Sequence, residues 1–147
     1  MKTSIVLFGA GHLGTYHLTK ITEHPEVKLH AIIETDISKH ADLKSKYDVP
    51  LYKGVEEMPN TADAAVIATP TSTHAEVATA AINLGMHVLI EKPICDHSGQ
   101  AEELCKFAAA NGKRIQVGHT ERFNPAISAA LAIADRPQYF VSERLAP

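Results

Sequence analysis

Residues 5–17, "IVLFGAGHLGTYH", specify the architecture of this chain more clearly than any other segment. An apolar run leads into a segment of helical period through Gly9, Gly11 and Gly14, at G-x-G-x-x-G spacing. Such glycines permit a tight turn, let a pyrophosphate approach the backbone and let a helix pack closely on a strand. The free N–H groups that begin the helix would face the phosphates. Because glycines also cluster in ordinary turns, a merely tight strand-to-helix turn is the alternative.

An acidic residue further along strengthens the nucleotide interpretation. Glu34 ends the second apolar run, about 20 residues after Gly14, where a carboxylate can accept hydrogen bonds from the adenosine ribose hydroxyls. The same carboxylate repels a 2′-phosphate, so we expect NAD in preference to NADP. Asp36 is the competing residue, although capping of the following helix with Ser38 explains it better. Lys39 could weaken the preference for NAD.

Along the rest of the chain, short apolar runs alternate with segments of helical period, which is typical of β-α-β units. Several of the runs are apolar without alternation, as strands covered on both faces should be. The sequence therefore predicts an α/β fold: a Rossmann-type, doubly wound parallel sheet in a three-layer αβα arrangement. The expected strands are Ser4–Phe8, Val27–Glu34, Pro50–Tyr52, Ala64–Thr69, His87–Ile90 and Arg114–Gly118, and the expected helices span 12–23, 38–47, 73–84, 99–111 and 125–134.

Some helix ends carry their own signals. Thr73 and Glu76 have the spacing of a capping box, and Gly85 stands where a left-handed C-cap is expected. Gly112 would end the next helix in the same way.

Composition limits the classes of partner. The 147 residues are 45% hydrophobic and 21% charged, with a formal net charge of −3 and no basic run that could follow a nucleic-acid backbone. We therefore expect no nucleic-acid partner. No apolar stretch of about 18 residues and no secretory signal are found, so we expect no membrane partner and a cytoplasmic location. The two cysteines and nine scattered histidines lack ligand spacing, so no metal site is predicted.

In a doubly wound sheet, ligands bind outside the carboxyl ends of the strands. The segments at those ends are "GAGHLG" (9–14), "ATPTSTH" (68–74) and "EKPICD" (91–96), so all three should line one crevice. Lys92 would then stand at the mouth of a strand beside the nucleotide. Alternatively, Glu91 and Lys92 simply form a solvated strand end.

Three ordered motifs carry a family resemblance: "VLFGAGHLG" (6–14), "AVIATPTSTHAEVATAAINLGMHVLIEKPI" (65–94) and "VGHTERFNPA" (117–126). Together they resemble the N-terminal half of the glucose–fructose oxidoreductase and inositol dehydrogenase family (Gfo/Idh/MocA) of NAD(P)-dependent oxidoreductases. The likeness extends over about residues 3 to 126. Within it, the Arg122–Pro125 run is similar to the branch that oxidises nucleotide-activated amino sugars, such as UDP-N-acetylglucosamine 3-dehydrogenases.

The resemblance implies roles for individual residues. Lys92 would be catalytic and contact the substrate hydroxyl, oriented by Pro93, which is commonly in a cis peptide in the family. His119 and Arg122 could reach the substrate, although a surface pair of Glu121 with Arg122 is the alternative. His74 could equally be a plain polar residue at a helix start. The implied cofactor-binding residues are Gly9, Gly11, His12, Leu13, Gly14, Glu34, Ala68, Thr69, Pro70, His74, Glu91, Lys92 and Pro93.

The resemblance also predicts the domain organisation. Residues 1–125 would form the dinucleotide-binding domain. Residues 126–147 would supply a connecting helix and, at Gln138–Leu145, the first strand of a missing C-terminal substrate domain that holds an acid/base histidine. We expect an NAD-dependent oxidoreductase of sugars or nucleotide sugars, homo-oligomeric at full length. The alternatives are a non-catalytic NAD-binding sensor module and an NAD(P)-dependent reductase of another class.

Overall fold

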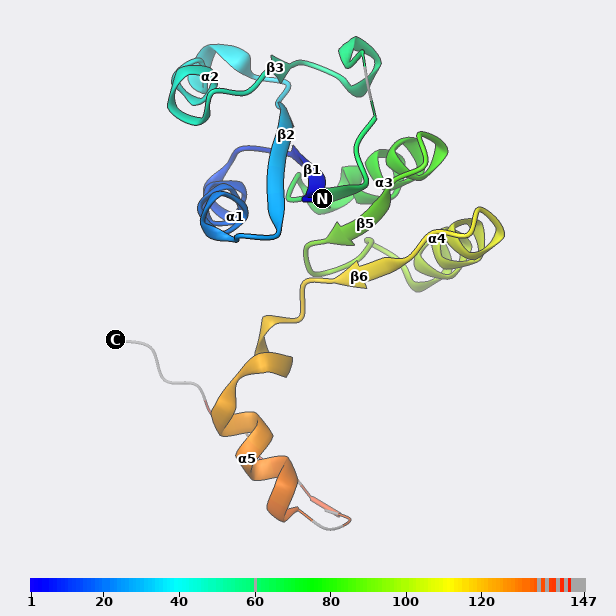
Figure 1. Cartoon of the computed structure of the whole chain (residues 1–147). Helices are drawn as coiled ribbons and strands as arrows, with labels where there is room; N and C mark the ends of the chain where they lie inside the picture. Colours follow the sequence, from blue (N-terminus) through cyan, green and yellow to red (C-terminus); the bar gives the residue numbers. More distant parts are fainter. Residues whose placement is uncertain (60, 135, 137, 140, 142, 144–147) are drawn as a thin grey trace.

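The computed structural model describes residues 1–59, 61–134, 136, 138, 139, 141 and 143. Its described residues form one six-stranded parallel sheet in the order β3-β2-β1-β4-β5-β6 (Figure 1). The strands are β1 (Thr3–Phe8), β2 (Val27–Ile33), β3 (Leu51–Tyr52), β4 (Ala64–Ile67), β5 (His87–Ile90) and β6 (Ile115–Val117). The order reverses beside β1, since β2 and β4 flank it. This is the doubly wound Rossmann topology that the sequence predicted.

The pairing register aligns the carboxyl ends of the central strands. Phe8 of β1 pairs with Ile33 of β2 and with Ile67 of β4, and Ile67 pairs in turn with Ile90 of β5. Each of these residues is followed directly by one of the predicted site segments or by Glu34. The three segments therefore start from one edge of the sheet, but only "GAGHLG" and "ATPTSTH" contribute residues to the cavity described below.

Helices cover both faces of the sheet, as Figure 1 shows. Leu7 of β1 packs in one cluster with Leu18 of α1 (His12–Glu23) and Leu43 of α2 (Asp42–Tyr47). The neighbouring residues Val6 and Phe8 belong to the opposite cluster, which includes buried residues of α3 (His74–Asn83) and α4 (Ser98–Ala110). Successive strand residues thus enter different apolar layers, which explains why the strands read as apolar without alternation.

The prediction of a single helix over 38–47 is wrong. The chain forms a 3-10 turn, η1 (Ile37–Lys39), and begins α2 only at Asp42. The cause is local: the Asp36 carboxylate accepts a hydrogen bond from the Ser38 hydroxyl at 2.6 Å and pairs with the Lys39 ammonium at 2.7 Å, which closes a tight turn. Asp36 therefore holds this turn together and does not cap an α-helix.

The capping box expected at Thr73 and Glu76 is also wrong. Thr73 ends the 3-10 turn η3 (Thr71–Thr73), its hydroxyl donates backward to the Pro70 carbonyl at 2.8 Å, and its side chain accepts no hydrogen bond from the first N–H groups of α3. The glycine C-caps are confirmed. Gly85 and Gly112 have positive φ values of 84° and 65°, the left-handed conformation that favours glycine.

After β6 the chain leaves the sheet through η4 (Thr120–Phe123) and α5 (Pro125–Ile133), which projects from the body in Figure 1. Asn124 caps α5, since its side chain accepts from the Ala126 N–H at 2.9 Å. The strand expected at Gln138–Leu145 lies partly outside the described residues, and the positions described within it are not in a strand. Within the described ranges, no helix is both long and apolar enough to cross a membrane.

Candidate functional site

A cavity of about 810 Å³ opens at the carboxyl edge of the sheet. It lies over the reversal of strand order at β1 and β4, where ligands bind in folds of this type. Eight of the predicted cofactor-binding residues line it: Gly9, Gly11, His12, Leu13, Glu34, Ala68, Thr69 and Pro70. The two segments "GAGHLG" and "ATPTSTH" therefore meet here.

The glycine turn forms one wall of this cavity. Gly9 has a φ of +86°, and a Cβ there would lie 2.7 Å from the carbonyl oxygen of Ala68. A Cβ on Gly14 would overlap the carbonyl oxygen of Gly9, so this glycine lets α1 pack against the turn. Gly11 differs, because a Cβ there would meet no protein atom within 4 Å. The Gly11 backbone is therefore left open to the cavity, as close approach of a pyrophosphate requires.

Gly11 is also the N-cap of α1, which has no side-chain cap and no acidic residue in its first turn. The first N–H groups of a helix carry partial positive charge and lack partners within the helix. Here they belong to residues beside the cavity, since His12 and Leu13 line it. This end of the cavity is suited to a phosphate.

Glu34 follows β2 and faces the glycine turn. One carboxylate oxygen, Oε2, accepts from the Ala10 N–H at 2.8 Å, and Oε1 accepts from the Asp36 N–H at 3.0 Å. Partial burial by itself raises the pKa of the Glu34 carboxyl. The two backbone hydrogen bonds and nearby His40 outweigh burial and hold the pKa below its usual value. Glu34 is therefore a fixed anion at the cavity wall, with lone pairs left for ribose hydroxyls.

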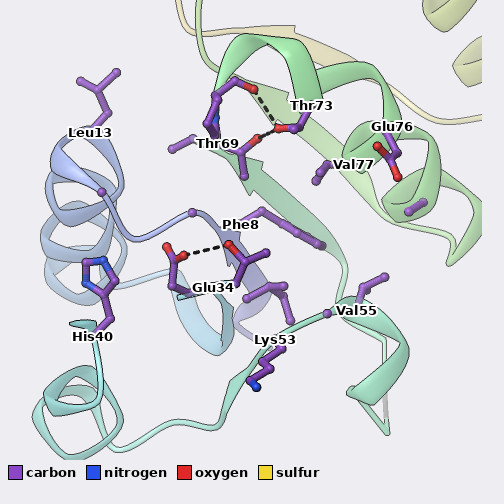
Figure 2. Close-up of a pocket in the computed structure, with 18 of the residues that line it drawn as sticks. Phe8, Leu13, Glu34, His40, Lys53, Val55, Thr69, Thr73, Glu76 and Val77 are labelled. Carbon is purple, nitrogen blue, oxygen red and sulfur yellow. Dashed lines mark hydrogen bonds between the residues drawn. The ribbon is translucent and has the colours of Figure 1, made fainter. Parts of the chain in front are cut away.

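The remaining walls, apart from Thr73 in the segment 68–74, were not predicted from the sequence. Figure 2 shows His40 and Lys53 near Glu34, with Glu76 and Val77 of α3 across the cavity from them. The α3 residues among them lie three or four positions apart on one face of the helix. The sequence alone does not show that this face borders the cavity. The additional lining residues are Phe8, Ile33, Thr35, His40, Lys53, Gly54, Val55, Glu56, Thr73, Glu76, Val77 and Ala80.

Lys92 lies at the same edge but outside the cavity lining. It follows Glu91 directly after β5, next to the β4 strand whose following residues line the cavity. Its side chain is exposed, and the Lys92–Pro93 peptide is cis, as the resemblance implied. Glu91 is 7% exposed, and its Oε1 lies 2.8 Å from His17 Nε2 of α1. The alternative of a solvated strand end therefore does not describe Glu91, which is buried.

His74 does not line the cavity. It is 1% exposed, with Nδ1 2.9 Å from the Pro93 carbonyl oxygen and Nε2 2.9 Å from the Thr69 carbonyl oxygen. Carbonyl oxygens only accept, so the ring serves both at once when both nitrogens carry hydrogen. His74 thus joins the turn after β4 to the segment that carries Lys92.

His119 and Arg122 follow β6 at the same edge and are exposed, but they are not part of the cavity lining. Glu121 accepts a hydrogen bond from the Asn124 side-chain amide at 2.7 Å. Among the residues that the structure describes, no three histidine, cysteine or acidic side chains are grouped so as to hold a metal ion.

Comparison with known proteins agrees with this geometry. The chain is 32% identical to UDP-N-acetylglucosamine 3-dehydrogenase from Acidithiobacillus ferrooxidans over 148 residues, which cover 100% of this chain and 46% of the relative. It is 36% identical to 4-carboxy-2-hydroxymuconate-6-semialdehyde dehydrogenase from a Sphingobium strain over 125 residues, which cover 82% of this chain and 39% of the relative. The chain thus spans less than half the length of these relatives.

Solved structures agree as well. The scyllo-inositol dehydrogenase from Lactobacillus casei with bound NAD(H) and scyllo-inositol has a TM-score of 0.84 at 25% identity, over 90% of this chain and 41% of that one. The family model described as "Oxidoreductase family, NAD-binding Rossmann fold" matches residues 3–119. The predicted family, fold and cofactor are thereby confirmed. The chain belongs to the Gfo/Idh/MocA family of oxidoreductases, of which it contains the NAD-binding Rossmann domain.

Proposed function

We propose that this chain is the cofactor-binding part of an NAD-dependent oxidoreductase that moves hydride to or from a carbinol carbon of a sugar or nucleotide sugar. The observation that carries the proposal is one sheet edge that combines an open glycine turn, the fixed carboxylate of Glu34 and the exposed ammonium of Lys92. NAD, when bound, supplies the hydride acceptor.

The residues of this chain would bind a dinucleotide in one orientation along the sheet edge. The backbone at Gly11 and the start of α1 would bind the pyrophosphate, and Glu34 would accept hydrogen bonds from the adenosine ribose hydroxyls. Ala68, Thr69 and Pro70 would contact the middle of the cofactor from the β4 side. This direction points the reactive end toward β5, where Glu91, Lys92 and Pro93 follow the strand.

Lys92 would act on the substrate oxygen. As the carbinol carbon loses its hydride, negative charge grows on that oxygen, and an ammonium hydrogen bond lowers the energy of this charge. A protonated lysine cannot accept the hydroxyl proton, so another group must take it. By its resemblance to the family, that group is a histidine of a second domain.

We also propose that residues 1–125 form the dinucleotide-binding domain and that residues 126–147 lead into a substrate domain. The support is α5, whose Leu131 and Ile133 are 69% and 87% exposed, together with relatives more than twice this length. His119 and Arg122 would then face the substrate from the β6 side. Homo-oligomeric assembly and a cytoplasmic location stay predictions, to be checked by sedimentation and cell fractionation.

A second substrate class is favoured by one comparison. The relative that is 36% identical is named as a dehydrogenase of a carboxylated semialdehyde, which is not a sugar. The hydrate of an aldehyde has a carbinol carbon, so loss of its hydride to the cofactor and of a hydroxyl proton to a base would give the carboxylic acid with the same cofactor geometry. The two classes differ in the substrate contacts, which this cavity does not contain.

The proposal is tested by NADH formation over a panel of inositols, nucleotide sugars and semialdehydes. We expect the 147-residue chain to bind NAD(H) without turnover, because hydride transfer needs the acceptor and donor carbons fixed together. Wherever the reading frame continues past Pro147, the longer chain should be active and should lose activity with Lys92→Met. Turnover by the short chain would contradict the proposal that catalysis needs a second domain. NAD binding without turnover of any substrate by the longer chain would favour a sensor module.

A further inference from the structure

Lys92 lies in a three-residue segment whose backbone is held on both sides. After Lys92, the Pro93 carbonyl is hydrogen-bonded to the buried ring of His74 at the start of α3. Before it, Glu91 contacts His17 of α1. These two helices are also the ones that contribute residues of their N-terminal turns to the cavity. The lysine is therefore tied to the same elements that line the cofactor cavity.

The contact before Lys92 depends on a buried carboxylate. Glu91 is 7% exposed; its Oε1 lies 2.8 Å from His17 Nε2, and its Oε2 accepts from the Lys92 N–H at 3.2 Å. An ionised carboxylate only accepts, so His17 Nε2 is the donor. A buried carboxylate without such donors would be costly. His17 thus stabilises Glu91 in the position from which it holds the Lys92 backbone.

The end of β6 leaves room for this arrangement. A Cβ on Gly118 would lie 3.0 Å from Oε1 of Glu91, closer than most real Cβ contacts. The Gly118 N–H donates to the Ile90 carbonyl at 2.8 Å, which keeps β6 beside the carboxylate. The Glu91 side chain is therefore confined between α1 and β6.

The side chain of Lys92 has no such support. It is exposed, and within the part of the chain that the structure describes it makes no hydrogen bond or ion pair. A lysine side chain has many rotamers, so the position of the backbone sets the region that its ammonium can reach. Control of that backbone is therefore the means by which this domain limits where the ammonium lies.

We propose that His17 is a positioning residue for Lys92, acting through the Glu91 carboxylate. The inference rests on the proposed function, in which the reactive end of the cofactor lies beside Lys92. His17 itself would touch neither cofactor nor substrate, since it lies in the second turn of α1 and does not line the cavity. Its loss should leave the cofactor bound and the lysine misplaced.

The test measures acetylation of Lys92 by acetic anhydride, read by peptide mass spectrometry with and without saturating NADH. Exposed Lys106 on α4 is the internal reference. The variants are His17→Leu, which removes the donor, and His17→Gln, whose amide can donate to Glu91. His24→Leu is the matched control, because His24 is an exposed histidine at the other end of the same helix. NADH affinity and melting temperature are measured for each.

NADH should protect Lys92 but not Lys106 in the wild type, and no protection there would mean that the proposed function is wrong. With protection present, His17→Leu should lose it at unchanged NADH affinity, whereas His17→Gln and His24→Leu should retain it. Full protection in His17→Leu would overturn the positioning role. Should His17→Leu fail to fold, Glu91→Gln decides, since one amide oxygen cannot replace both carboxylate oxygens. Protection should fall in that variant, and undiminished protection would again overturn the role.

Discussion

The Glu34 carboxylate accepts a hydrogen bond from the Ala10 N–H at 2.8 Å, which joins the end of β2 to the middle of the glycine turn. The glycine turn and Glu34, which the sequence indicates as separate cofactor-binding features, are therefore in direct contact, although Ala10 and Glu34 are 24 residues apart. The bond fixes the carboxylate before any ligand binds, and the same carboxylate fixes the turn. Changes to Glu34 should consequently affect both nucleotide choice and the stability of the turn.

The first prediction concerns NADH against NADPH. A 2′-phosphate beside the Glu34 carboxylate suffers repulsion of about 1–4 kcal/mol at close range, so NADH should bind at least roughly fivefold more tightly than NADPH. Fluorescence titration with both nucleotides measures the ratio. Glu34→Gln should narrow it, whereas Asp36→Asn, which neutralises a carboxylate already paired with Lys39, should leave it unchanged. Equal affinities in the wild type would remove Glu34 from this role.

The second prediction concerns acid stability. The folded-state pKa of Glu34 lies below its ordinary value of 4.5, so the folded protein binds fewer protons there than the unfolded chain. The resulting stability is complete above pH 4.5 and decreases as the pH falls through the folded-state pKa. Urea unfolding at neutral pH and below pH 4.5 should show a smaller acid loss for Glu34→Gln than for the wild type. Parallel losses would show that Glu34 has no linked titration.

The third prediction separates ligand binding from folding at two open glycines. A side chain on Gly11 meets no protein atom but enters the cavity, so Gly11→Val should abolish NADH binding with little change in melting temperature. Gly99 of α4 is equally open and lies away from the cavity, so Gly99→Val is the matched control and should bind normally. If Gly11→Val bound NADH like the wild type, the pyrophosphate would not approach this turn.

The fourth prediction concerns His74. His74→Phe keeps the ring volume but removes both nitrogens, leaving the buried contacts to the Thr69 and Pro93 carbonyls unmade. Each lost partner costs about 1–3 kcal/mol, so the free energy of unfolding should fall by about 2–6 kcal/mol. Urea unfolding measures this, with His24→Phe as an exposed control. A loss no larger than that of the control would show that the two hydrogen bonds contribute little.

Local patterns were sufficient to predict the glycine turn, the place of Glu34 beside it and the alternation of strands with helices. The local reasons for glycine are the positive φ at Gly9 and the contact of Gly14 with Gly9, and Glu34 follows at a regular interval. The closeness of Ala68 to Gly9 is a further reason that only the fold shows. The helix ends at Gly85 and Gly112 were predictable in the same way, because a left-handed cap is a property of one residue. Patterns that depend on so few neighbouring residues can be recognised before the fold is known.

Contacts between distant elements could not be predicted. His17 and Glu91 are 74 residues apart, and His74 reaches Pro93 across 19, so neither pairing has a local pattern. The cavity wall from Lys53 to Glu56 follows a two-residue strand, too short to give a periodic signal. Thr73 is the reverse case: a local pattern predicted a capping box there, but the residue ends the 3-10 turn before α3 and does not cap the helix with its side chain.

The central claim is that NAD(H) occupies the cavity with its nicotinamide end beside Lys92. The most direct test is to titrate the isotope-labelled chain with NADH and with ADP-ribose, which lacks the nicotinamide, and to follow the backbone amides by NMR. Both ligands should saturate and shift Gly11, Glu34 and Thr69, and only NADH should shift Lys92. Absence of saturable binding, or a Lys92 amide that NADH leaves unmoved, would contradict the account.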